Sequence, residues 1–178
     1  RLPKKKMVFS YLSGSGRFVA GVGKIGDIYA HIGLTESYHT GDNPADMKAL
    51  TEQLLAHRDR EGLLMANFVD FDSQYGHRRN VEGYAACIEA FDDMLGHFLP
   101  LVQPDELLMI TADHGNDPTW KGTDHTRERV PLVVYSPALT EPVNLGIRKT
   151  YADLGQTIMD NFSLGQLPAG TGFLSELR

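Results

Sequence analysis

The stretch Leu107-Leu108-Met109-Ile110-Thr111-Ala112-Asp113-His114-Gly115 is an apolar run that ends in a carboxylate beside an imidazole. A short apolar run of this kind is typical of a buried β-strand, and Gly115 permits a tight turn directly after it. Asp113 and His114 are therefore expected just beyond the end of a strand. A second imidazole, His125, follows in the next loop.

A second apolar run, residues 63–69, ends in the same way. Asp70 and Asp72 follow it, and His77 lies five residues beyond Asp72, a spacing that we interpret as a loop. The nearly continuous apolar character of the run indicates a strand buried on both faces. Two strand ends therefore present carboxylate and imidazole groups at one edge of the expected sheet.

These side chains suit a divalent metal ion. Aspartate oxygens are hard ligands, and imidazole binds Mn²⁺, Zn²⁺ and iron. One such pair alone is more often a surface ion pair, but three groups at strand ends favour a metal centre, and metal ions suit phosphate chemistry. The candidate metal ligands are Asp72, His77, Asp113, His114 and His125.

The rest of the sequence alternates between strand and helix patterns. Helices are predicted near 7–12, 43–62, 81–101 and 150–161, and strands at 18–22, 63–69, 107–110 and 130–135. Residues 28–41 are expected to be irregular. Asn43 is expected to cap a helix that has Pro44 in its first position. This order indicates an α/β fold with a mainly parallel sheet flanked by helices, in which ligands bind at the carboxyl ends of the strands.

Composition limits the possible functions. The chain has 178 residues, of which 42% are hydrophobic and 22% charged, as expected for one globular domain. The net charge of −6 argues against nucleic acid or an anionic membrane as a partner. No apolar run approaches the roughly 20 residues that span a bilayer. The single cysteine, Cys87, excludes an internal disulfide and fits a reducing compartment such as the cytoplasm.

Longer motifs around the candidate ligands resemble the phosphopentomutase family, whose members are metal-dependent enzymes of the alkaline phosphatase superfamily. The resemblance begins near Phe18 and continues to the end of the chain. The matching stretches are residues 21–28, 35–37, 69–79, 111–118, 122–128 and 172–174. The resemblance implies an alkaline-phosphatase-like core, of which this chain holds a part.

The resemblance also implies a reaction and a set of roles. The family interconverts ribose 1-phosphate and ribose 5-phosphate, and the corresponding deoxyribose phosphates, through a phosphothreonine intermediate with two Mn²⁺ ions. Lys24 resembles a residue that contacts the phosphate of the substrate. The ligands of one metal are matched by Asp72, His77 and His125, and ligands of the other by Asp113 and His114.

The chain departs from the family in length, because family members are much longer. The resemblance therefore implies that residues 1–178 form the C-terminal half of the catalytic core, without the N-terminal half, the cap domain or the nucleophilic threonine. Thr111, Thr123 and Thr126 belong to the metal motifs instead. The chain is expected to be inactive alone. Its sheet would have an open edge, which predicts either a homo-oligomer or binding of the missing half.

Two other functions stay open at this point. One is another metal-dependent phosphotransferase of the same superfamily, such as a cofactor-independent phosphoglycerate mutase, or a phosphodiesterase. The other is a metal-binding fragment that has lost catalysis. The sequence around His77 and at residues 117–120 favours phosphopentomutase.

Overall fold

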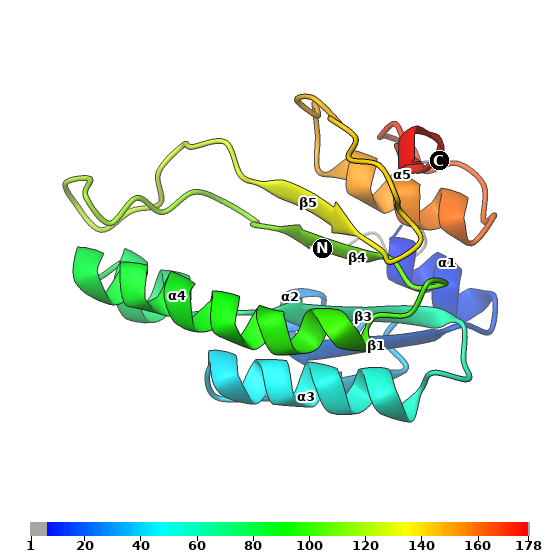
Figure 1. Ribbon diagram of the computed structural model, residues 1–178, viewed down its shortest axis with the longest axis horizontal. Helices are drawn as coiled ribbons and strands as arrows, with labels where there is room; N and C mark the ends of the chain where they lie inside the picture. The colour runs from blue at the N-terminus through cyan, green and yellow to red at the C-terminus, as the bar shows by residue number, and fades with distance from the viewer. Residues whose placement is uncertain (1–6, 178) are drawn as a thin grey trace.

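The computed structural model describes residues 7–177, which form alternating helices and strands (Figure 1). The α/β class expected from the sequence is confirmed. None of the helices in this range is both long and apolar enough to cross a membrane. The elements in chain order are α1 Val8–Gly14, β1 Phe18–Gly23, α2 Ile25–Ile28, β2 Glu36–Tyr38, α3 Asn43–Ala56, β3 Gly62–Asn67, the π-helix η1 Phe71–Gly76, α4 Val81–Phe98, η2 Leu99–Leu101, β4 Leu108–Thr111, β5 Leu132–Tyr135, α5 Ala152–Asn161 and η3 Leu174–Leu177.

The strands form two separate ladders. β1 lies between β2 and β3 in a parallel sheet, while β4 and β5 form an antiparallel pair. β3 and β4 run in the same direction and end at the same side of the molecule (Figure 1), as expected for a crossover through α4. No ladder within residues 7–177 joins β3 to β4, so each of these strands has one unpaired edge.

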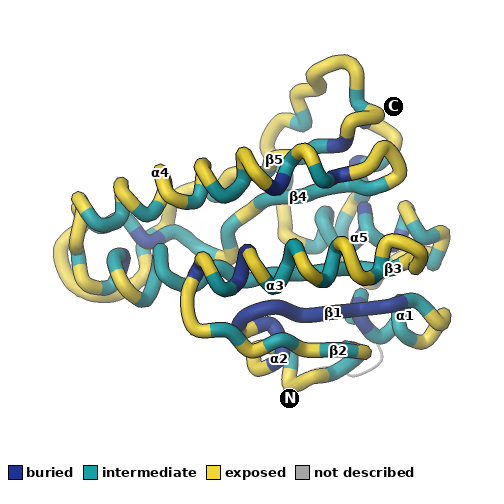
Figure 2. Tube along the Cα trace, turned by 60° about the horizontal axis from the view of Figure 1, so that its bottom comes forward, coloured by how far each residue is buried: buried dark blue, intermediate teal, exposed yellow. Residues whose placement is uncertain are grey.

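Two apolar clusters enclose the parallel sheet. In one, Phe9 and Leu12 of α1 pack with Val19 of β1 and with partly buried residues of α5. In the other, Met47 of α3 packs with Phe98 at the end of α4. All six residues of β1 are buried (Figure 2), whereas β3 is only half-buried along its length. The expectation of a fully buried second strand is therefore wrong, because β3 lacks a neighbour at its outer edge.

The segment 28–41 is not irregular throughout, because it contains β2. This strand has three residues and no apolar periodicity, so no pattern in the sequence identifies it. Thr35 holds the beginning of β2 against β1. Its backbone N–H donates to the Val19 carbonyl at 2.8 Å, and its side chain makes two further hydrogen bonds to Val19. The Thr35 hydroxyl donates to the Val19 carbonyl at 2.9 Å and accepts from the Val19 amide at 3.0 Å.

The start of α3 also differs from expectation. The residue that caps it is Asp42, whose carboxylate accepts a hydrogen bond from the Ala45 amide at 2.9 Å. Asn43 is buried and pairs with Asp70 instead. The Asp70 carboxylate accepts a hydrogen bond from the backbone N–H of Asn43 at 2.9 Å. The side-chain oxygen of Asn43 accepts one from the backbone N–H of Asp70 at 3.1 Å. This reciprocal pair ties the segment after β3 to α3 and so positions the residues that follow Asp70.

Candidate metal centre

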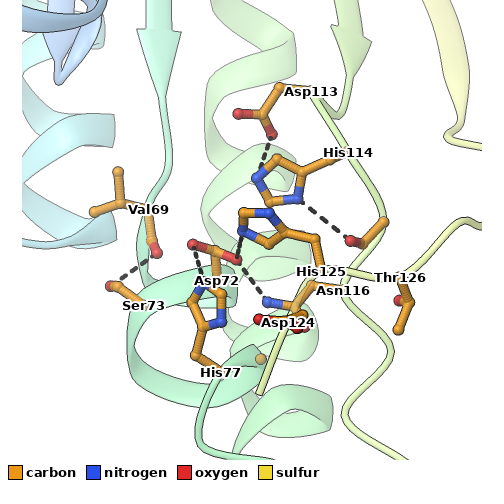
Figure 3. A network of polar contacts seen from close by, with 12 residues as sticks. Val69, Asp72, Ser73, His77, Asp113, His114, Asn116, Asp124, His125 and Thr126 are labelled. Atoms are coloured by element: carbon orange, nitrogen blue, oxygen red, sulfur yellow. Dashed lines mark hydrogen bonds and ion pairs between the residues drawn. The ribbon is translucent and has the colours of Figure 1, made fainter. Parts of the chain in front are cut away.

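The candidate ligands lie beyond the carboxyl ends of β3 and β4 (Figure 3). The π-helix η1 carries Asp72, and His77 follows it directly. Asp113 and His114 follow β4 after Ala112, and His125 lies in the loop that leads to β5. Three chain segments that are far apart in the sequence therefore meet at one edge, as the strand pattern predicts.

The Asp72 carboxylate lies at the centre of this group. His77 Nε2 is 3.3 Å from Asp72 Oδ2, and His125 Nε2 is 3.4 Å from Asp72 Oδ1. The ring centroids of His77 and His125 are 4.7 Å apart, and those of His114 and His125 are 3.8 Å apart. Three imidazoles thus surround a carboxylate, and two of them direct a ring nitrogen at it.

Asp72, His114 and His125 meet the distance requirement for a shared cation, because each offers a ligand atom within 4.8 Å of the other two. One carboxylate and two imidazoles form a donor set that suits Mn²⁺, Zn²⁺ or iron. The residues therefore fit a divalent metal ion. The division of the five ligands between two metals stays a prediction, since the distances group His114 rather than His77 with Asp72 and His125.

Backbone carbonyls orient two of the imidazoles. His77 Nδ1 lies 2.5 Å from the Thr123 carbonyl oxygen, and His114 Nδ1 lies 3.3 Å from the Gly115 carbonyl oxygen. A ring nitrogen that donates to a carbonyl leaves the lone pair of the other nitrogen for a metal. Asp113 is exposed, and one of its oxygens lies 3.7 Å from His114 Nε2. The second carboxylate thus lies beside the nitrogen that His114 offers to a metal.

The π-helix η1 explains how Asp72 and His77 come to face each other. The His77 amide donates to the Asp72 carbonyl at 3.0 Å, which is a hydrogen bond between residues five apart. The Ser73 hydroxyl donates to the Val69 carbonyl at 2.9 Å and fixes the start of the turn. The prediction of a loop between Asp72 and His77 is therefore wrong, because a π-helical turn connects them. Single π-helical turns are rare and are often found at functional sites.

Two polar residues outside the set of candidate ligands, Asn116 and Arg79, support the site. Asn116 is 8% exposed, and its amide nitrogen donates to Asp72 Oδ1 at 2.6 Å. Its amide oxygen accepts from Arg79 Nη1 at 2.7 Å. Gly76 makes this approach possible, because a Cβ atom there would lie 2.5 Å from Asn116 Nδ2. The one sequence signal for these residues is that they fall inside the motifs 69–79 and 111–118.

Lys24, the candidate phosphate contact, lines a cavity of about 420 Å³. His39, Asp46 and Ser73 also line it, and Ser73 follows Asp72 directly in η1. Because Ser73 is next to Asp72 in the chain, the cavity adjoins the candidate metal centre. Burial raises the pKa of the Asp46 carboxyl in the cavity wall, although a hydrogen bond from Thr40 acts in the opposite direction.

A family model described as the metalloenzyme superfamily matches residues 19–166. The chain is 49% identical over 170 residues to the phosphopentomutase of Caldanaerobacter subterraneus subsp. tengcongensis, covering 96% of this chain and 43% of that protein. It is 48% identical over 167 residues to the phosphopentomutase of Limosilactobacillus reuteri, covering 93% of this chain and 41% of that protein. The chain therefore spans less than half the length of the curated relatives that it matches.

Two solved structures share the fold. The PH0037 protein of Pyrococcus horikoshii has a TM-score of 0.56 and 23% sequence identity, over 70% of this chain and 34% of that chain. Phosphoglycerate mutase from Leishmania mexicana has a TM-score of 0.64 and 19% identity, over 91% of this chain and 37% of that chain. At these identities the likeness shows the fold alone, which is the alkaline-phosphatase-like α/β core expected from the sequence.

Proposed function

We propose that this chain, which belongs to the metalloenzyme superfamily, forms the C-terminal part of the catalytic core of a phosphopentomutase. The observation that carries the proposal is the convergence of Asp72, His114 and His125 within 4.8 Å of one another, in a chain 49% identical over 170 residues to a protein of that name. The proposed reaction interconverts the 1-phosphate and 5-phosphate of ribose or deoxyribose.

The proposed cofactor is Mn²⁺, with two ions in the whole enzyme. Such ions, when bound, stabilise charge on the phosphoryl oxygens and activate the attacking oxygen. The role of this chain would be to hold the metal ligands in place. Asn116 fixes the Asp72 carboxylate, and the Thr123 carbonyl fixes the ring of His77. The ligands of one ion would be Asp72, His77 and His125, and those of the other would include Asp113 and His114.

Lys24 is proposed to bind the phosphate of the substrate. Its side chain lines the cavity of about 420 Å³ next to η1, and cavities of roughly 300–1,000 Å³ commonly hold small molecules. An ammonium group binds phosphate as a point charge. In the acidic chain, this lysine would supply a local positive charge where the substrate enters.

The nucleophilic threonine is proposed to come from an N-terminal half that docks beside β3 and β4. These strands run in the same direction, and each has an unpaired edge (Figure 1). A strand from that half would satisfy exposed backbone groups of one or both edges. Without it, the chain is expected to be inactive or to pair with a second copy of itself.

A cytoplasmic location is part of the same proposal. Cys87 is a free thiol, and burial raises its pKa, so less of it is present as the reactive thiolate. A free cysteine in a protein without disulfides is typical of a reducing compartment.

A chimera would test the proposed activity. The C-terminal part of the phosphopentomutase of Caldanaerobacter subterraneus that matches this chain would be replaced by residues 7–177. We expect the chimera to interconvert ribose 1-phosphate and ribose 5-phosphate with Mn²⁺, and a chimera with His125→Ala to lose this activity. A folded, metal-loaded chimera without mutase activity would contradict the proposal.

A second candidate is a phosphoglycerate mutase-type activity. It is favoured by the structural likeness to the Leishmania mexicana enzyme over 91% of this chain. Assaying the same chimera with 3-phosphoglycerate separates the two candidates, because turnover of that substrate instead of ribose phosphate would favour the second.

A further inference from the structure

Arg79 lies between the π-helix η1 and the loop that carries His125. Its guanidinium group donates hydrogen bonds to five oxygen atoms. The acceptors are the backbone carbonyls of Gly76, Asp117, Gly122 and Asp124 and the side-chain oxygen of Asn116. Three of the four carbonyls belong to the loop between β4 and β5. One side chain thus holds several separate points of this loop against η1.

Only arginine can make this set of contacts. Its planar group carries N–H bonds on three nitrogens in a fixed arrangement, and the two N–H bonds of Nη1 reach three acceptors, so one of them is shared between two oxygens. Lysine has a single ammonium group that acts as a point charge. The backbone of Arg79 also has a positive φ of 53°, a conformation that is unfavourable for residues other than glycine. The contacts of its side chain therefore stabilise a backbone conformation that arginine rarely adopts.

Two routes connect these contacts to the candidate metal ligands. In the first, the Arg79 guanidinium holds the Asp124 carbonyl, and the next residue is His125. In the second, Arg79 Nη1 donates to Asn116 Oδ1 at 2.7 Å, which turns the amide nitrogen of Asn116 toward Asp72. That nitrogen donates to Asp72 Oδ1 at 2.6 Å.

We propose that Arg79 is a positioning residue, which brings Asp72 and His125 into the geometry that binds a divalent metal ion. This inference rests on the proposed metal centre. It assigns Arg79 no contact with the metal or the substrate. The residue acts through the loop carbonyls and through Asn116, so its loss changes metal affinity and coordination geometry rather than the identity of the ligands.

The test compares Mn²⁺ affinity and the Co²⁺ absorption spectrum of the chain with those of Arg79→Met and Arg79→Lys. Arg78→Met is the matched control, because Arg78 is exposed and its one described hydrogen bond is 3.4 Å long. We expect Arg79→Met to weaken Mn²⁺ binding by about 10–100-fold, as is typical for residues that support a metal ligand. Arg79→Lys should be intermediate, and Arg78→Met should match the unaltered chain.

The Co²⁺ ligand-field spectrum separates positioning from general stability, because it reports the coordination geometry. It should change in Arg79→Met and stay constant in Arg78→Met. In a background of Asn116→Ala, the effect of Arg79→Met on affinity should be smaller, because one route is already broken. Unchanged affinity and an unchanged spectrum in Arg79→Met would overturn the inference.

If Arg79→Met does not fold by circular dichroism, Arg79→Lys decides the question. Affinity and spectrum equal to those of the unaltered chain would then overturn the inference, and weakened affinity with a changed spectrum would support it. Failure of the unaltered chain to bind Mn²⁺ or Co²⁺ would instead contradict the proposed metal centre, and with it this inference.

Discussion

Asn116 donates a hydrogen bond of 2.6 Å to the carboxylate of Asp72, although the two residues lie 44 positions apart in the sequence. The other end of the Asn116 side chain accepts from Arg79, so both of its polar ends have partners. This contact links the segment after β4 to the segment after β3. The segments that follow β3 and β4 therefore lie at the same edge of the molecule, and the buried side-chain amide of Asn116 also links them directly.

The contact depends on the absence of a side chain at Gly76. In Gly76→Ala the new Cβ would lie 2.5 Å from Asn116 Nδ2 and 2.9 Å from the Phe71 carbonyl oxygen. We expect a loss of about 1–3 kcal/mol in the free energy of unfolding, because overpacked sites must shift. Urea denaturation followed by circular dichroism would measure it.

Gly96→Ala is the matched control for this substitution. Gly96 lies in α4, and a Cβ there would meet no atom within 4 Å. It should stabilise the chain by about 0.5–1 kcal/mol, because alanine favours the helix over the unfolded chain. Equal stability of the two variants would contradict the close packing at Gly76.

The buried carboxyl of Asp46 should give the chain a specific pH dependence. It is 1% exposed, and burial raises its pKa above the usual 3.8, with Asp70 and Asp42 adding to the rise and Thr40 and His39 opposing it. The folded state therefore holds this proton more tightly than the unfolded chain. The stabilisation that results is present at low pH and is lost as pH rises through the folded-state pKa.

Asp46→Asn removes this titration while keeping an oxygen that can accept from Thr40. The free energy of unfolding of the unaltered chain, relative to the variant, should fall as pH rises from acidic to neutral. Urea denaturation of both proteins across this range would measure the difference. A constant difference, or one that grows with pH, would show that the raised pKa is wrong.

The division of ligands between two metals can be tested with single histidine variants. If Asp72, His77 and His125 hold one ion and Asp113 and His114 contribute only two ligands to the other, the first ion binds more tightly. His77→Ala should then lower the affinity of the tighter site, and His114→Ala that of the weaker one. Titration calorimetry with Mn²⁺ distinguishes these outcomes. Loss of the tighter site in His114→Ala alone would favour the grouping of Asp72, His114 and His125.

The unpaired edges of β3 and β4 predict association of the isolated chain. Exposed backbone donors and acceptors at a strand edge favour pairing with another strand. Sedimentation velocity should therefore detect oligomers that grow with protein concentration. A monomer at all concentrations would contradict the prediction.

The strands that carry the fold could be predicted because each is a short apolar run that ends in a turn signal. β1 and β4 lie within one residue of their predicted positions. β2 could not be predicted, since its three residues are placed by the hydrogen bonds between Thr35 and Val19. The antiparallel pairing of β4 with β5 could not be predicted either, because apolar runs do not specify their partner.

The convergence of Asp72, His77, His114 and His125 at one edge could be predicted because carboxylates and imidazoles at strand ends form a local pattern. The residues that support these side chains, Asn116 and Arg79, could not be predicted. Asn116 reaches Asp72 across 44 positions, and Arg79 reaches Asn116 across 37, so these contacts exist only in the folded chain. The π-helical turn between Asp72 and His77 likewise has no periodicity that would distinguish it from a loop.

The most direct test is titration of the chain with Mn²⁺, compared with Asp72→Asn and His97→Ala. Asp72 contacts both His77 and His125, whereas His97 is an exposed residue of α4. We predict that the unaltered chain and His97→Ala bind Mn²⁺ with similar affinity and that Asp72→Asn, folded as judged by circular dichroism, does not. Binding by Asp72→Asn as tight as that of the unaltered chain would contradict a metal centre at this site.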